Sequence, residues 1–214
     1  MDAFGIEQAV LSPPDSTTSN NLYLKAASIY PDRLFSACTL NPRPIDETRL
    51  QLKEYVDQGC KAMVLDEKLY HPTDPAAHAL LKTAIDLDIA IYFEGSEMRS
   101  DTLAFVDSIS LMYPDSRLVI LHMGGLFSFP NLIPLLARDN IWFDISLTLT
   151  KLVESPLRSY LDALVQDIGV QKLVFGSTHH TEYDNLKAAM NMINLNYEQS
   201  NVITKENALK ILKI

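Results

Sequence analysis

The stretch "DETRLQLKEYVDQGCKAMVLD", residues 46–66, decides the fold because a helical pattern runs directly into an apolar strand. Apolar residues recur on one helical face, Asp46 is a candidate N-cap and Gly59 is a typical C-terminal stop. The run that follows, "KAMVLD" (61–66), is apolar on both faces, which is typical of a parallel strand covered by helices. The stretch therefore predicts a helix that packs on a parallel sheet.

The same alternation continues along the chain. Six further short apolar runs are predicted strands, at residues 8–12, 33–40, 89–94, 118–123, 141–146 and 172–177. Helical patterns lie between or after them, at residues 74–88, 100–116, 155–169, 182–193 and 204–214. Strand and helix in strict alternation specify an α/β domain with parallel strands and right-handed crossovers.

Two architectures compete for this pattern. A doubly wound sheet that binds a nucleotide needs a glycine-rich phosphate loop, and the seven glycines form neither G-x-G-x-x-G nor a Walker-type loop. We therefore expect no nucleotide cofactor. A (β/α) barrel uses ~30 residues per unit, so seven units account for the chain. The sequence predicts a TIM-type barrel that is one strand short of eight.

Composition narrows the class of protein. The 214 residues are 47% hydrophobic and no linker divides them, so we expect a single domain over residues 1–214. The net charge of −9 disfavours nucleic acid and anionic membrane surfaces as partners. Cys38 and Cys60 lack the spacing of a zinc motif and are interpreted as reduced core thiols. No signal peptide or membrane span is recognisable, so we expect a cytoplasmic protein.

Several motifs, in this order, resemble the amidohydrolase-related family, the "amidohydrolase 2" group of metal-dependent TIM-barrel hydrolases and decarboxylases. They include "PDRLFSACTLNP" (31–42), "LDIAIYFEGSE" (87–97), "LVILHMGGLFSFPNL" (118–132), "NIWFDIS" (140–146) and "KLVFGST" (172–178). The resemblance covers nearly the whole chain. It implies an incomplete or distorted barrel whose first family strand is missing, and a divalent metal such as zinc or manganese.

The resemblance also assigns site positions residue by residue. The family's first-strand His-x-His pair has no counterpart, because this chain starts after it. The family histidine that ends the strand matching "IAIYFEG" is Glu94 here, and the histidine of H-x-G-G is His122. The family aspartate of G-S-D is Thr178, a neutral hydroxyl that is neither a good ligand nor a base. The departures predict a divergent or lost metal site, because a catalytic zinc needs three protein ligands.

Two adjacent histidines, His179 and His180, follow the last predicted strand. One of them could reach inward and complete a relocated metal site with His122 and Glu94. The alternative is that both are exposed loop residues near the start of the next helix, which loop geometry favours.

Four further residues could contribute to the site. Asp66 and Asp144 lie at or near the carboxyl ends of strands, where barrel active sites form, although each could instead cap a helix. Gly124 and Gly125 follow His122 and leave backbone room for a substrate. We expect Glu94, Asp66 and Thr178 to take part in catalysis with His122. We expect Asp144 and the two glycines to bind substrate.

Three functions remain open. The first is a metal-dependent hydrolase or decarboxylase that cleaves a C–N, C–O or C–C bond of a small carboxylated or cyclic substrate. The second is a metal-free relative in which His122 works as general acid or base with Asp66, Glu94 or Asp144. The third is an inactive member that binds a small molecule or a partner chain. Exposed strand edges at the missing position predict a homodimer.

Overall fold

The computed structural model describes the backbone of residues 1–214 and every side chain except those of Phe129, Asp167 and Ile168. The chain divides into two compact units, Met1–Phe93 and Glu94–Ile214. The described residues form seven strands, and with their helices these make an incomplete TIM-type α/β barrel. The predicted fold class is confirmed, whereas the single domain stays a prediction.

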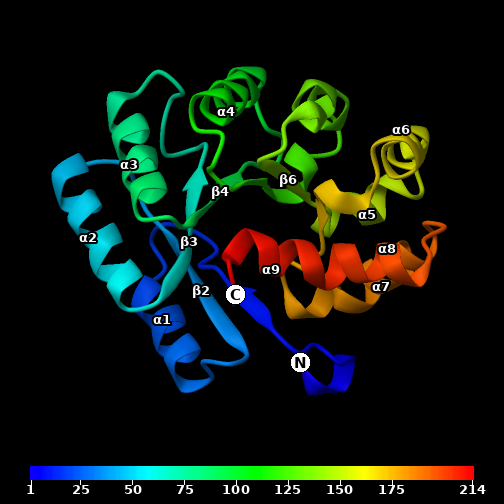
Figure 1. Cartoon of the computed structure of the whole chain (residues 1–214), viewed down its shortest axis with the longest axis horizontal. Coiled ribbons are helices and arrows are strands. Elements are labelled where there is room, and N and C mark those ends of the chain that lie inside the picture. The colour runs from blue at the N-terminus through cyan, green and yellow to red at the C-terminus, as the bar shows by residue number, and fades with distance from the viewer. The chain divides into compact units, whose positions relative to one another are not determined.

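The first unit holds the first four strands and three helices. These are β1 (Ala9–Leu11), α1 (Asn20–Ile29), β2 (Leu34–Thr39), α2 (Ile45–Asp57), β3 (Cys60–Asp66), α3 (Pro75–Asp86) and β4 (Ala90–Glu94), whose last residue opens the second unit. β1 pairs with β2, and β2 with β3, both in parallel. Helix α1 packs on β2, and α2 packs on β3 and α3. The three helices lie along the same side of β2 and β3 (Figure 1).

The second unit holds three strands and most of the helices. These are α4 (Ser100–Met112), β5 (Leu118–Ile120), β6 (Ile141–Asp144), α5 (Ser146–Leu152), α6 (Arg158–Ala163), β7 (Leu173–Val174), α7 (Tyr183–Asn191), α8 (Tyr197–Asn201) and α9 (Asn207–Leu212). β5 pairs with β6, and β6 with β7, again in parallel. The strands are short because irregular turns replace the ends that the apolar runs predicted.

Burial explains why the strand sequences are apolar on both faces. Successive residues of a strand point to opposite faces of its sheet. Ala62 and Met63 in β3 are both fully buried, and the successive residues Trp142 and Phe143 in β6 are buried as well. Because both faces are covered, an alternating polar residue would lose its hydration without gaining a partner.

The cysteines differ from the expectation of two reduced thiols. Cys38 in β2 and Cys60 at the start of β3 form a disulfide, with their Cα atoms 6.5 Å apart. Sequence spacing could not show this because the register of the two parallel strands brings the residues together. The disulfide removes the reduced thiols as an argument for a cytoplasmic location, which stays a prediction.

Helix ends differ from the prediction in two places. Helix α2 begins at Ile45 after Pro44, so Asp46 lies in the first turn and is not the N-cap. Thr204 begins the predicted helix 204–214 and would be its cap, but its hydroxyl donates to the carbonyl of Ser200 inside a continuous helical run. Gly59 does follow the end of α2, with a φ of +100° that favours glycine. Within the described residues, no helix combines the length and apolar character that a bilayer crossing requires.

Candidate active site

A left-handed turn follows β5 and carries His122. Four successive residues have positive φ: His122 (+55°), Met123 (+52°), Gly124 (+68°) and Gly125 (+98°). Glycine adopts this conformation readily, whereas residues with a Cβ do so at a cost of about 1–3 kcal/mol each. The predicted strand 118–123 therefore stops at Ile120, and its last three residues turn His122 out of the sheet.

The second unit holds this turn from two sides. The backbone N–H of His122 donates to Asp144 Oδ2 at 3.1 Å, and the hydroxyl of Thr148 donates to the His122 carbonyl. On the other side, the N–H of Met98 donates to the Gly124 carbonyl at 2.7 Å. These bonds replace the ladder bonds that a longer strand would make, so the strained turn keeps its backbone groups satisfied.

Both ring nitrogens of His122 have partners. Nε2 lies 3.2 Å from Glu94 Oε1, and Nδ1 lies 2.6 Å from the hydroxyl oxygen of Ser146. The Ser146 hydroxyl donates its own proton to Asp144 Oδ2 at 2.6 Å. A hydroxyl has one proton, so Ser146 must accept from His122, and the proton of the neutral ring lies on Nδ1.

This direction of bonding fixes what Nε2 does. With the neutral ring protonated at Nδ1, a bare nitrogen lone pair would face the carboxylate of Glu94. One added proton between Nε2 and Oε1 converts that repulsion into a charge-assisted hydrogen bond. The pair of Glu94 and His122 is therefore arranged to hold one exchangeable proton, and the Glu94 side chain is 29% exposed.

The pKa values follow the same geometry. Burial opposes the charged form of His122 and is the largest single influence, but the hydrogen bond to Glu94 and the charges of Asp144 and Glu94 together outweigh it. The pKa of His122 is therefore raised above 6.5. Burial raises the pKa of Asp144, against the opposing effects of His122 and Ser146.

Asp144 is held closely by neighbouring protein groups. Its side chain is only 9% exposed and accepts from Ser146 and from the His122 backbone. A Cβ at Gly176 would lie 2.3 Å from Asp144 Oδ1, so the chain after β7 packs directly on the carboxylate. This placement makes Asp144 an orienting group for His122. Its predicted role in substrate binding stays a prediction.

The glycines after His122 also meet protein atoms. A Cβ at Gly125 would lie 2.4 Å from the carbonyl oxygen of Ser96 and 2.5 Å from the Glu97 carboxylate. The Glu97 carboxylate accepts the backbone N–H groups of Leu126, Phe127 and Ser128 at 3.0–3.2 Å. The room that Gly125 provides is therefore taken up by the chain around Glu97, and Gly124 is buried.

Asp66 and Thr178 each lie at a turn that follows a strand. Asp66 ends β3 in the first unit, and its carboxylate accepts the N–H of Lys68 at 2.9 Å, which is a local turn. Thr178 is exposed and has a φ of +59° in the turn after β7. Their predicted catalytic roles stay predictions.

The paired histidines are exposed. His179 is the N-cap of a short 3₁₀ turn, His180–Glu182, and its Nδ1 lies 2.9 Å from the Thr181 hydroxyl. The rings of His179 and His180 lie with their centres 4.2 Å apart and their planes tilted by 43°. Their predicted part in metal binding stays a prediction.

Sequence reasoning missed Ser146, which links Asp144 to His122. The stretch "WFDIS" (142–146) does contain a signal, because a hydroxyl two residues after a carboxylate at the end of a strand can bond back to that carboxylate. The contact of Ser146 with His122 depends on the pairing of β5 with β6, which the local sequence does not contain.

The described residues do not fit a conventional catalytic metal site. His122 Nε2 and Glu94 Oε1 are two donors 3.2 Å apart, whereas a catalytic zinc takes three protein ligands and keeps an open position. No cluster of three or more His, Cys, Asp or Glu side chains suited to a metal occurs among the described residues.

Comparisons with known proteins agree with the fold. No curated protein matches the sequence. Similar solved structures include an uncharacterized TIM-barrel protein from Bordetella bronchiseptica (17% identity, TM-score 0.83, covering 100% of this chain and 80% of that chain). A second is 5-carboxyvanillate decarboxylase from Novosphingobium aromaticivorans complexed with manganese (14% identity, TM-score 0.78, covering 100% of this chain and 78% of that chain). A third is a probable 2-pyrone-4,6-dicarboxylic acid hydrolase from Acinetobacter baumannii (17% identity, TM-score 0.75, covering 100% of this chain and 86% of that chain).

At these identities the structural similarity establishes the fold alone. The sequence model of the amidohydrolase family adds the family, because it matches residues 1–214, the full length of the chain. The match agrees with the order of motifs around Glu94 and His122. The chain belongs to the amidohydrolase family.

Proposed function

We propose that the chain is a hydrolase or lyase that cleaves a C–N, C–O or C–C bond of a small carboxylated or cyclic substrate by proton transfer at the Glu94–His122 pair. The observation that supports this most is the direction of the bonds from Asp144 through Ser146 to Nδ1, which leaves one exchangeable proton at Nε2. Such a proton, next to a partly exposed carboxylate, is what general acid–base catalysis requires.

The chemistry uses the chain's own groups. In a hydrolysis, the pair takes a proton from the attacking water and returns it to the leaving oxygen or nitrogen. In a decarboxylation, His122 delivers its Nε2 proton to the carbon from which CO₂ leaves, and the pair regains a proton from water. Asp144 and Ser146 keep the ring in one tautomer and stabilise its charged form during either transfer.

Two observations support a cyclic carboxylate as the substrate class. The similar structures include a decarboxylase of 5-carboxyvanillate and a probable hydrolase of 2-pyrone-4,6-dicarboxylic acid, and both substrates are cyclic carboxylates. In this chain, the protonated His122 is a cation next to the reaction position, so a substrate carboxylate can pair with it.

Turnover of these two compounds tests the proposal. We expect one of them, or a close hydroxybenzoate or lactone analogue, to be converted by the purified protein. His122→Gln should lower kcat/KM by about 10²-fold or more, because a general acid–base group contributes 10²–10⁴-fold. Glu94→Gln should act in the same direction.

The matched control is His71→Gln, which replaces an exposed histidine of the first unit. Equal rates in His122→Gln and the wild type would overturn the acid–base role. Tight binding of the compounds without any turnover would instead support the alternative of an inactive binding protein.

A further inference from the structure

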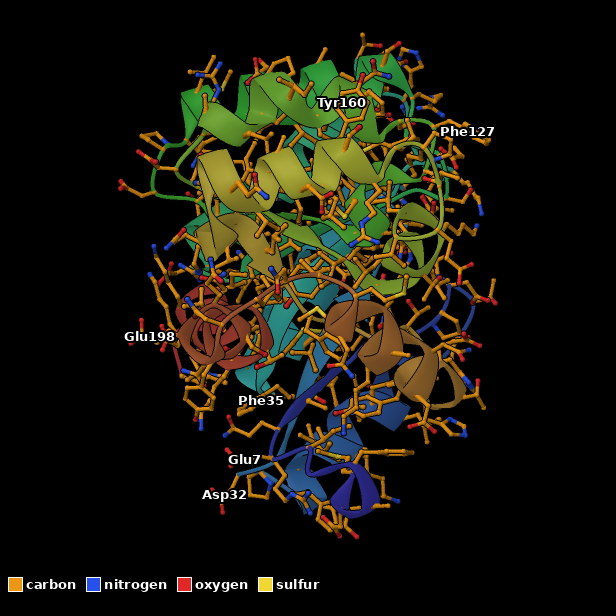
Figure 2. The ribbon with its side chains drawn as sticks, turned by 90° about the vertical axis from the view of Figure 1, so that its right-hand side faces the viewer. Glu7, Asp32, Phe35, Phe127, Tyr160 and Glu198 are labelled. Carbon is orange, nitrogen blue, oxygen red and sulfur yellow. A yellow bond between two sulfur atoms is a disulfide. The ribbon has the colours of Figure 1, made fainter. Side chains whose placement is uncertain are left out.

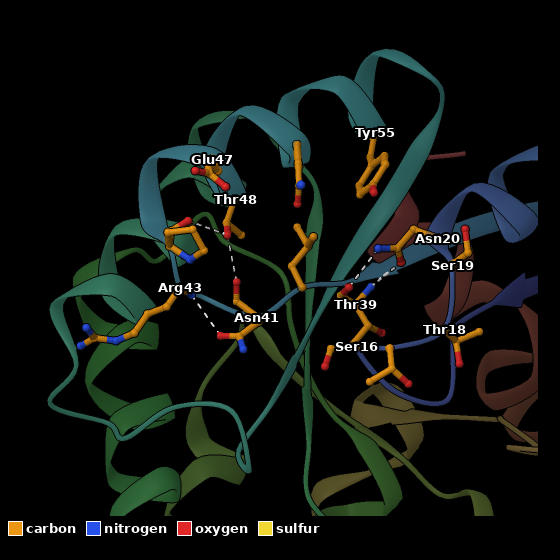
Figure 3. Close-up of a pocket in the computed structure, with 14 residues that line it drawn as sticks. Ser16, Thr18, Ser19, Asn20, Thr39, Asn41, Arg43, Glu47, Thr48 and Tyr55 are labelled. Atoms are coloured by element: carbon orange, nitrogen blue, oxygen red, sulfur yellow. Dashed lines mark hydrogen bonds between the residues drawn. The ribbon is translucent and has the colours of Figure 1, made fainter.

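A small polar cavity lies in the first unit, at the carboxyl end of β2 and beside the first turns of α1 and α2 (Figure 3). Its volume is about 270 Å³, below the range of roughly 300–1,000 Å³ that suits drug-sized ligands. Of its fourteen lining residues, seven carry a hydroxyl, three carry an amide, two are charged and two are apolar. The cavity therefore offers many uncharged donors and acceptors in a small space.

The charges of the cavity disfavour an anion. Its one cationic side chain among the fourteen lining residues is Arg43, and the carboxylate of Asp74 binds that guanidinium through two bonds of 2.7 and 3.0 Å. The first turn of α2 already carries Asp46 and Glu47, which offset the positive end of its helix dipole. A phosphate or carboxylate would meet Glu47 without finding an uncommitted cation.

The floor of the cavity is rigid. The buried carboxamide of Asn20 makes two hydrogen bonds with the backbone of Thr39, at 2.9 and 3.0 Å. The hydroxyl of Thr48 donates to the carbonyls of Asn41 and Pro44, at 3.0 and 2.8 Å. Figure 3 shows these bonds fixing α1 and α2 to the end of β2. A preformed site of this kind loses little entropy when it binds a ligand.

The walls of the cavity, in contrast, carry polar side chains that are available to a ligand. Within the described residues, the side chains of Ser19, Gln51 and Tyr55 make no hydrogen bond. The ring of Tyr55 packs on the buried cluster of Leu24, Cys38 and Cys60, which holds it in place, and its hydroxyl end points from α2 toward Asn20 in Figure 3. An aromatic edge beside free hydroxyl and amide groups suits a molecule with both C–H and O–H surfaces.

We propose that this cavity binds a neutral, polyhydroxylated small molecule of about monosaccharide size. Its hydroxyls would bond to Ser19, Gln51 and Tyr55, and Glu47 would accept one further hydroxyl proton. The proposal is independent of the proposed function, because every lining residue lies in the first unit and none belongs to the group around His122.

Chemical-shift mapping of the ¹⁵N-labelled full chain tests this, with D-glucose, D-galactose, D-mannose and myo-inositol as separate probes at millimolar concentrations. We expect at least one probe to shift the backbone amides of Ser19, Asn20 and Asn41 in a saturable way. Tyr55→Phe and Gln51→Ala should each weaken that binding roughly five-fold, the effect of one lost hydrogen bond. Tyr30→Phe, an exposed tyrosine of the same unit outside the cavity, should leave it unchanged.

Two results would overturn the proposal. One is the absence of saturable shifts at these amides with all four probes. The other is saturable binding of inorganic phosphate at the same amides in preference to the neutral probes, which would make the cavity an anion site. Both variants change side chains at the cavity wall only, and preserved spectra of their remaining residues would show that they fold.

Discussion

Two carboxylates, of Glu94 and Asp144, favour the charged form of His122. Its pKa is raised above 6.5 because Glu94 and Asp144 together outweigh the effect of burial. A group whose pKa is higher in the folded protein stabilises the fold fully below its unfolded pKa. That contribution is lost as the pH rises through the folded pKa. The free energy of unfolding should therefore carry a His122 contribution that shrinks toward alkaline pH.

Urea unfolding of the wild type and of His122→Gln at several pH values measures this contribution as a difference. We expect the advantage of the wild type to be largest below pH 6.5 and to fall as the pH rises. Titrating groups that do not contact His122 cancel in the difference, so a flat or rising advantage would contradict the assigned partners of the ring.

Gly176 tests how closely Asp144 is held. A Cβ at this position would lie 2.3 Å from Asp144 Oδ1, and the backbone there does not need positive φ. Gly176→Ala should thus act by collision alone, lowering the free energy of unfolding by about 1–3 kcal/mol and moving Asp144 away from Ser146. Ser177→Ala, one residue along, is the control and should change the stability by less than about 0.5 kcal/mol. Equal stability of both variants would show that the packing on Asp144 is loose.

The turn after β5 is the element on which the site depends, and Glu97 anchors its far end. The Glu97 carboxylate accepts three successive backbone N–H groups, from Leu126 to Ser128. Phe127 projects from this loop with 78% of its surface exposed (Figure 2), so apolar packing contributes little to holding the loop. The carboxylate therefore links the loop to the residues that precede α4, together with the Ser128 hydroxyl, which donates to the Met98 carbonyl at 2.8 Å.

Removing that carboxylate should release the loop. We expect Glu97→Ala to speed amide hydrogen exchange at Leu126, Phe127 and Ser128, and to cost about 1 kcal/mol in stability. Glu154→Ala, an exposed glutamate of the same unit, should leave exchange at these amides unchanged. Unaltered exchange in Glu97→Ala would mean that other contacts hold the loop.

Elements were predictable where a local pattern decides them. The helix before Gly59 and the strand "KAMVLD" (61–66) appear as α2 and β3, because helical periodicity and burial on both faces are written in short stretches. The ends of β5 and β7 were predicted too long. At β5, hydrogen bonds with Asp144, Thr148 and Met98 make a left-handed turn more favourable than continued strand pairing. Those partners lie outside β5, so the local sequence does not reveal them.

The candidate site divides in the same way. The family pattern identified the positions of His122 and Glu94, whose Nε2 and Oε1 atoms lie 3.2 Å apart. It could not locate Ser146, whose role depends on the register of β5 against β6, and it gave no sign that Asp144 would be enclosed by Gly176. The order of motifs along the chain does not tell which residues of different strands come into contact.

For the molecule as a whole, we predict a homodimer. In the first unit, Met1 and Phe4 are more than a third exposed, and Leu22 and Ile29 on α1 are more than half exposed. Exposed apolar side chains and a short strand such as β1 (Ala9–Leu11) are typical of surfaces that associate. Sedimentation equilibrium at tens of micromolar should show a dimer, and Phe4→Asp should shift it toward monomer. A strict monomer for the wild type would refute the prediction.

Metal content tests most directly whether the pair of Glu94 and His122 holds a proton or a metal. The measurement is elemental analysis of the purified protein, as wild type and as His122→Ala, after dialysis against a weak chelator. With two suitable donors 3.2 Å apart, we predict far less than one zinc or manganese per chain in both proteins. About one metal per wild-type chain, lost in His122→Ala, would contradict the acid–base account and assign a metal to this site.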